Sequence, residues 1–143
     1  MIALDTNLLA YAQRRHAPEH DKARDAIEQA LSDSRGCGIS LPSIAEYWKV
    51  VTHPRSEGGP STPREAEGFF RSLLDQTELQ IWIPRPDFTQ RLLRNAVDLS
   101  VSGHRIFDLQ IALIALENGA TEIWTHDRDF LKVRGLRVYD PLS

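Results

Sequence analysis

Four acidic residues stand where an α/β fold places its chemistry. They are Asp5, Glu46, Asp108 and Asp127. Two of them follow the short apolar segments Met1–Leu4 and Glu122–Trp124, and the other two lie near the starts of predicted helices. If the strands are parallel, all four carboxylates can meet at one edge of the sheet. That edge, outside the carboxyl ends of the strands, is where open α/β sheets bind their ligands.

Carboxylates gathered in this way need a positive partner. Without a cation, each pair of charges repels by about 4 kcal/mol at 4 Å and an effective dielectric constant of 20. A fold that gathers four acids is therefore expected to hold a hard divalent cation. Oxygen ligands favour Mg²⁺ or Mn²⁺ over Zn²⁺. Such a cation can polarise a phosphate and acidify a water molecule, so the cluster points to phosphodiester hydrolysis.

Strands and helices alternate along the chain. The predicted strands are Ile2–Leu4, Gly38–Ser40, Leu79–Ile83, Glu122–Trp124 and Leu136–Tyr139. The predicted helices are Thr6 to about Arg14, Ala17–Leu31, a helix from near Pro42 to Pro54, Pro63 to about Gln76 with Thr62 as its cap, Asp87–Ser100, and Asp108 to about Asn118. This alternation implies a parallel sheet.

Composition indicates one ordinary globular domain spanning residues 1–143. Apolar residues make up 41% of the chain and charged residues 26%, which is typical of such domains. No apolar run approaches the roughly 18 residues of a membrane span, and the first residues do not resemble a signal peptide. We therefore expect a cytoplasmic protein without membrane contact. Cys37 is the only cysteine, which excludes an intrachain disulfide and a cysteine-rich zinc site.

The net charge of −3 alone argues against a nucleic-acid partner. However, 14 of the 17 basic residues are arginine, which contacts phosphate through two parallel hydrogen bonds. Several basic residues flank the acidic positions: Arg14, Arg15, His53, Arg55, His104, Arg105 and Arg128. They form either a substrate-binding rim or a set of solvated surface charges.

The first two acids also have structural interpretations. Asp5 could cap the following helix, but Thr6 can cap it equally well, which would leave Asp5 free to face the cleft. Glu46 could close a capping box with Ser43. Pro42 indicates that the helix has already begun before Ser43, which places Glu46 beyond the capping position.

The last two acids have structural alternatives as well. Asp108 lies on the same predicted helix face as Ile111 and Ala115, where an acid is costly to bury unless it is paired or bound to metal. Its alternative role is again a helix cap. Asp127 could be a turn residue, and Asp129 could assist or replace it. Thr125 either donates to the site acids or simply ends the strand.

The acidic segments resemble the motifs of PIN domains. The similar segments are Leu4–Leu9, the Glu46 helix, Asp108–Ala115 and Thr125–Phe130. The resemblance extends from Met1 to about Tyr139. A single-domain chain of this length is most similar to VapC-type toxins of toxin–antitoxin pairs, and Tyr47–Arg55 resembles a subgroup of them. The resemblance implies a three-layer α/β fold, in which helices cover both faces of a five-stranded parallel sheet.

The resemblance also implies a function. It is that of a Mg²⁺- or Mn²⁺-dependent ribonuclease that cleaves single-stranded RNA, binds a small antitoxin and forms a homodimer. Asp5 and Asp108 would be primary metal ligands, and Glu46 and Asp127 would complete the site or bind through water. Candidate substrate contacts are Thr6, Arg105 and Arg128, within a rim that also includes Arg14, Arg15 and Arg55. Exposed aromatic residues on the helices from Pro42 to Gln76, notably Tyr47 and Trp48, would form the surface for partners, although these two residues could equally belong to the core.

Two other interpretations remain open. The chain could be a PIN-like interaction module without metal, although its complete acidic set argues against that. It could also be a phosphatase with Asp5 as nucleophile, although such enzymes usually carry a second acid where Asn7 stands. Asn7 is more simply interpreted as an ordinary first-turn residue than as a group that orients Asp5. His126 replaces the Asn often found in the family. Its imidazole could contact metal or substrate, but it is more simply interpreted as a turn residue.

Overall fold

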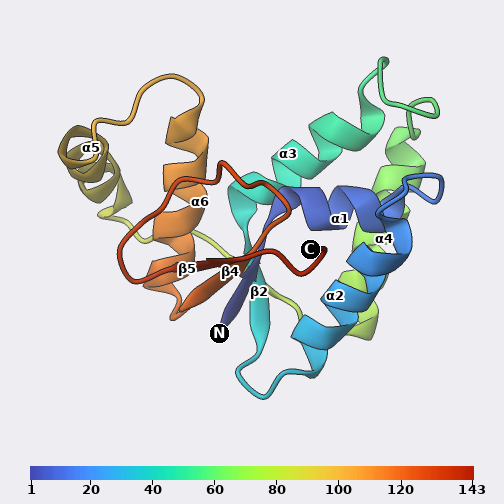
Figure 1. Ribbon diagram of the computed structural model, residues 1–143, viewed down its shortest axis with the longest axis horizontal. Helices are drawn as coiled ribbons and strands as arrows, with labels where there is room; N and C mark the ends of the chain where they lie inside the picture. Colours follow the sequence, from blue (N-terminus) through green and yellow to red (C-terminus); the bar gives the residue numbers. More distant parts are fainter.

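A parallel five-stranded sheet forms the centre of the molecule in the computed structural model, which describes all 143 residues (Figure 1). Its strands are β1 (Ile2–Leu4), β2 (Cys37–Ser40), β3 (Gln80–Trp82), β4 (Glu122–Trp124) and β5 (Arg137–Tyr139). They lie in the order β3-β2-β1-β4-β5, and every neighbouring pair is parallel. The predicted sheet is therefore confirmed, and the carboxyl ends of its strands share one edge.

Six helices connect the strands. They are α1 (Thr6–Gln13), α2 (His20–Ser32), α3 (Leu41–Thr52), α4 (Pro63–Gln76), α5 (Phe88–Asp98) and α6 (Arg105–Glu117). In Figure 1, α5 and α6 lie on one side of the sheet, and α1, α2 and α4 lie on the other. The predicted three-layer arrangement is confirmed. None of the helices is both long enough and apolar enough to cross a membrane.

The sheet separates two hydrophobic cores. Ile2 and Leu4 of β1 face the core formed with α1 to α4, whereas Ala3 between them faces the core formed with α5 and α6. This alternation follows from the two-residue period of a strand. Because β1 is buried on both faces, it fixes the position of the residue that follows it, Asp5.

Two helix starts differ from the sequence prediction. Helix α2 begins at His20 instead of Ala17, because the preceding residues form turns in which the Ala17 amide donates to the Arg14 carbonyl. Helix α6 begins at Arg105, so Asp108 lies within its first turn and not at its start. The predicted cap of α4 is confirmed, because Thr62 and Glu65 form a reciprocal capping box.

The predicted aromatic surface on α3 is only half correct. Tyr47 is fully buried, packs against Phe69 and Phe70, and donates a hydrogen bond of 2.8 Å to the Ala66 carbonyl. Trp48 is exposed. Tyr47 therefore belongs to the core and cannot be part of a partner surface.

Candidate active site

The sheet topology brings all four predicted acids to one edge. Asp5 follows β1, Asp127 follows the neighbouring strand β4, and the ends of these strands are paired through Leu4 and Trp124. Their charges also interact across the edge: Glu46 and Asp108 raise the pKa of Asp5, and Asp127 and Glu46 raise the pKa of Asp108. The four carboxylates therefore share one electrostatic environment.

Asp5 is the most deeply buried of the four, with 6% of its surface exposed. Its Oδ1 accepts a hydrogen bond from the Thr6 amide at 2.8 Å, and its Oδ2 accepts one from the Thr125 hydroxyl at 2.8 Å. Asp5 is thus the N-cap of α1, and the expectation that Thr6 would cap the helix in its place is wrong. A carboxylate has about four acceptor positions, so capping leaves room for a further ligand.

The electrostatics of Asp5 are those of an acid that lacks a cation. Burial raises its pKa to about 6, the hydrogen bonds from Thr125 and Thr6 oppose this rise, and the charges of Glu46 and Asp108 add to it. None of the salt bridges in the structure involves Asp5. A buried carboxylate of this kind is stabilised by a nearby positive charge.

The Thr6 hydroxyl, which was expected to cap α1, holds Glu46. Thr6 donates from Oγ1 to Glu46 Oε2 at 2.9 Å, which links the start of α1 to α3. Helix α3 begins at Leu41 with Pro42 in its first turn, so Glu46 lies beyond the capping position. The capping-box alternative for Glu46 is therefore excluded, as Pro42 indicated.

Asp108 and Asp127 stand on the outer side of the cluster. Asp108 is half-buried, and its Oδ2 accepts a hydrogen bond of 3.2 Å from the Leu131 amide. Burial raises its pKa, that hydrogen bond and the charge of Arg105 oppose the rise, and Asp127 and Glu46 add to it. Asp127 is exposed and accepts from the Asp129 amide at 2.9 Å.

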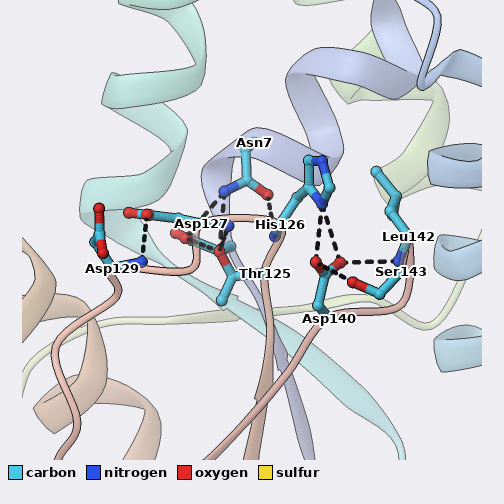
Figure 2. A network of polar contacts seen from close by, with 9 residues as sticks. Asn7, Thr125, His126, Asp127, Asp129, Asp140, Leu142 and Ser143 are labelled. Atoms are coloured by element: carbon cyan, nitrogen blue, oxygen red, sulfur yellow. Dashed lines mark hydrogen bonds and ion pairs between the residues drawn. The ribbon is translucent and has the colours of Figure 1, made fainter.

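Asn7 and Thr125 join the two strand ends (Figure 2). Asn7 donates from Nδ2 to Thr125 Oγ1 at 2.9 Å and to Asp5 Oδ2 at 3.5 Å, and its Oδ1 accepts from the His126 amide at 3.1 Å. The interpretation of Asn7 as an ordinary first-turn residue is therefore wrong. Two roles were left open for Thr125, and the structure shows the first of them, because its hydroxyl donates to Asp5.

Sequence reasoning missed Asp140, which lies beside the same network. Its carboxylate contacts Nδ1 of His126 at 3.0 Å (Figure 2). A signal for it existed, because Asp140 directly follows β5 and so obeys the same strand-end rule as Asp5 and Asp127. The weak apolar character of β5 made that signal easy to overlook.

The predicted arginine rim is only partly assembled. Arg105 donates to the Asp129 carbonyl at 3.0 Å and lies close enough to influence Asp108, and Arg128 follows Asp127 directly. Arg14 lies at the opposite end of α1 from Asp5, roughly 14 Å along the helix axis at 1.5 Å per residue.

The guanidinium of Arg14 stabilises a loop. It donates to the carbonyls of Val51, Glu57 and Gly59 and so fastens the loop between α3 and α4. Arg14 and Arg15 also line a groove between α1, α2 and α4. Both residues therefore stand apart from the acids, and their assignment to the rim is wrong. Arg55 lies beyond the end of α3, far along that helix from Glu46.

The donor chemistry of the cluster fits a hard divalent cation. All four predicted ligands offer carboxylate oxygens, the type that Mg²⁺ and Mn²⁺ prefer. Their shared charge and the buried, cation-free Asp5 both favour such an ion. No three His, Cys, Asp or Glu side chains are arranged to hold a metal directly, so the carboxylates would have to draw together or bind through water.

Comparison with known proteins assigns the family. The PIN domain model matches residues 2–136. Ribonuclease VapC48 of Mycobacterium tuberculosis is 30% identical over 139 residues, which are 97% of this chain and 96% of the relative.

Two solved structures share the fold. One is M. tuberculosis VapC20, described as a sarcin-ricin loop cleaving toxin, with a TM-score of 0.67, 14% identity and coverage of 91% of this chain and 92% of that chain. The other is Rickettsia felis VapBC2 bound to a promoter DNA fragment, with a TM-score of 0.66, 20% identity and coverage of 98% of each chain. The chain therefore belongs to the PIN domain family and is homologous to VapC ribonucleases over nearly its full length.

Proposed function

We propose that this protein is a metal-dependent endoribonuclease that cleaves single-stranded RNA as the toxin of a toxin–antitoxin pair. One observation carries the proposal: four carboxylates share one sheet edge, and the most buried of them, Asp5, has no cationic partner. The relatives support the reaction class, because VapC48 is named a ribonuclease and VapC20 is described as a toxin that cleaves the sarcin-ricin loop.

Asp5 and Asp108 would hold Mg²⁺ or Mn²⁺, and Glu46 and Asp127 would complete the site or bind through water. When bound, the cation supplies positive charge to the scissile phosphate and acidifies a water molecule. The protein contributes orientation. Thr125 holds Asp5 through its hydroxyl, and Thr6 holds Glu46 in the same way. These hydrogen bonds restrict how Asp5 and Glu46 are oriented before the carboxylates draw together around the metal or bind it through water.

Arg105 and Arg128 would contact the RNA backbone. Arg105 uses one N–H to reach the Asp129 carbonyl, which leaves most of its five donors free. Arg128 is exposed beside Asp127. Their positions at the open side of the acids favour contact with phosphates that flank the scissile bond. Thr6 fits a different role from the predicted substrate contact, because it is buried and its hydroxyl is engaged by Glu46.

A small antitoxin and a second copy of this chain are the proposed partners. The neighbour from R. felis supports the antitoxin, because VapBC2 was solved as a complex bound to its promoter DNA. Trp48, exposed on α3, is the remaining aromatic candidate for a partner surface.

The phosphatase alternative loses support from the geometry. Asn7, which stands where the second acid would be, bridges Thr125 and the His126 amide. Failure to trap an aspartyl-phosphate would complete its exclusion.

The test of the proposal is cleavage of single-stranded RNA by the purified chain with Mn²⁺ or with EDTA. We expect cleavage with metal and none with EDTA. Asp5→Asn and Asp108→Asn should each lower the rate by more than about a hundredfold, because each removes a charge from the metal ligands.

Asp75→Asn is the matched control, because Asp75 is exposed on α4 and away from the acids. It should cleave like the wild type, and all three variants should melt as cooperative folds. Undiminished cleavage in EDTA would exclude the metal mechanism. A chain that binds no Mn²⁺ by calorimetry and cleaves no RNA would be the interaction module.

A further inference from the structure

His126 and Asp140 form a polar pair beside the acids that the proposed reaction does not use. Nδ1 of His126 lies 3.1 and 3.0 Å from the two carboxylate oxygens of Asp140. The same carboxylate accepts from the Leu142 amide at 2.9 Å and from the Ser143 hydroxyl at 2.8 Å. An ionised carboxylate can only accept, so Nδ1 carries the proton and donates it. The segment after β5 is thereby joined to the turn after β4.

The backbone of His126 is held from the opposite direction. Its amide donates to Asn7 Oδ1 at 3.1 Å, and Asn7 also donates to the Thr125 hydroxyl. The His126 ring meets Tyr11 edge-on, with 6.1 Å between the ring centroids. Residues of helix α1 therefore contact this turn on one side, and Asp140 contacts it on the other.

The next residue along the chain is Asp127, whose amide donates to Thr125 Oγ1 at 3.0 Å. In Figure 2 the His126 ring turns toward Asp140, while Asp127 lies on the other side of Asn7. The imidazole therefore does not reach the acids itself. It can act on them only by fixing the backbone from which Asp127 projects.

We propose that His126 and Asp140 form a clamp that positions the turn 125–127 and so holds Asp127 toward the other three acids. The clamp deepens the proposed function, on which the role of Asp127 rests. His126 is 30% exposed and Asp140 19% exposed, so the pair is partly shielded from water and holds more firmly than a surface ion pair. Groups that orient metal ligands typically change metal affinity or activity by about 10–100-fold.

The test compares three variants by Mn²⁺ affinity and by kcat and KM for RNA. His126→Ala removes the clamp and should weaken Mn²⁺ binding about tenfold and lower kcat, with KM for RNA unchanged. His126→Asn should restore both values, because its side-chain N–H can donate to Asp140 from nearly the position of Nδ1. Ser143→Ala is the matched control: it removes a 2.8 Å hydrogen bond to the same carboxylate without touching the turn.

A second readout does not depend on activity. In metal-free protein, the amides of His126 and Asp127 should exchange with solvent faster in His126→Ala and in Asp140→Ala than in the wild type or in Ser143→Ala. In the double variant His126→Ala/Asp140→Ala, these amides should exchange no faster than in either single variant, because each substitution alone already removes the interaction between the two side chains.

Either of two results would overturn the clamp. One is wild-type amide exchange and Mn²⁺ affinity in His126→Ala. The other is a His126→Asn variant as impaired as His126→Ala. If the wild type neither binds Mn²⁺ nor cleaves RNA, the proposed function fails, and amide exchange alone then decides whether the clamp exists.

Discussion

At the scale of single residues, the site is built from acids and the hydroxyl and amide groups that hold them. Thr6 shows how one residue holds two acids through two different groups. Its backbone amide donates to Asp5, and its hydroxyl donates to Glu46, so one residue orients two acids on different elements. The substitution of such a residue should affect the chemical step more than RNA binding.

Thr6→Val tests that role, because it removes the hydroxyl and keeps the shape. Glu46 loses its 2.9 Å hydrogen bond, and we expect kcat to fall about tenfold while KM for RNA stays constant. Thr6→Ser keeps the hydroxyl and should behave like the wild type. A rise in KM alone in Thr6→Val would restore the view of Thr6 as a substrate contact. Steady-state cleavage kinetics make the distinction.

Arg105 and Arg128 give the opposite expectation. Arg105→Gln and Arg128→Gln should raise KM for RNA without abolishing Mn²⁺ binding, because they would remove the proposed phosphate contacts. Each lost contact should also reduce the slope of log affinity against log salt by about 0.7, the value for single strands. Arg64→Gln, at an exposed arginine on α4, is the control and should leave both quantities unchanged. Wild-type salt dependence in both site variants would place the RNA elsewhere.

The gathering of the four acids at one edge was predictable from the order of strands and helices, although Glu46 and Asp108 lie inside their helices, so their placement also depends on which helix face they occupy. A residue that directly follows a strand lies at the carboxyl edge of a parallel sheet, as Asp5 does. The partners of the acids were not predictable in the same way. Thr125 lies 120 residues from Asp5 along the chain, and its hydroxyl finds that carboxylate only through the pairing of β1 with β4. Asn7 was misread for the same reason.

At the scale of elements, local signals placed the helices more reliably than their first residues. Pro42 and Thr62 marked the starts of α3 and α4 correctly, because both act through neighbouring backbone groups. The predicted start of α2 at Ala17 was less accurate, since the turns before His20 depend on contacts with the end of α1.

Glu122 links three parts of the sheet and provides a test of element pairing. Its carboxylate accepts hydrogen bonds from Trp124 Nε1 on its own strand and from Arg137 Nε on β5. Its Oε2 also lies 3.6 Å from Nη1 of Arg35, which precedes β2 in the chain. Burial raises the pKa of Glu122, but the hydrogen bonds from Trp124 and Arg137 and the two arginine charges outweigh it, so the pKa is lowered.

A lowered folded-state pKa means that the stabilisation by Glu122 is full above its ordinary pKa and is lost as the pH falls through the folded value. Glu122→Gln should therefore lower the free energy of unfolding by about 1–2 kcal/mol at pH 7, and the difference should shrink below about pH 4. Urea unfolding of the wild type and of the variant, at pH 7 and below about pH 4, measures this difference in the free energy of unfolding. Glu67→Gln, in an exposed pair with Arg71 on α4, is the control and should show no measurable change. A difference that does not vary with pH would contradict the ionic role of Glu122.

At the scale of the whole molecule, we expect the proposed metal site to couple metal binding to folding. Asp5, Glu46, Asp108 and Asp127 come from four separate parts of the chain, and only the folded sheet brings them together. Their mutual repulsion opposes folding when no cation is present. A divalent ion that binds the folded state and not the unfolded chain should therefore stabilise the entire fold.

Thermal unfolding with and without Mn²⁺ tests this linkage without any cleavage assay. At a hundred times the dissociation constant, a ligand specific for the folded state adds about 2.7 kcal/mol, which should raise Tm by roughly 5–10 °C in a chain of this size. Asp5→Asn should melt near the metal-free wild type or above it, because it removes a buried charge, and Mn²⁺ should no longer shift its Tm. Asp75→Asn, at an exposed acid of α4, should keep the full shift. An equal Mn²⁺ shift in Asp5→Asn and in the wild type would mean that the ion binds away from Asp5.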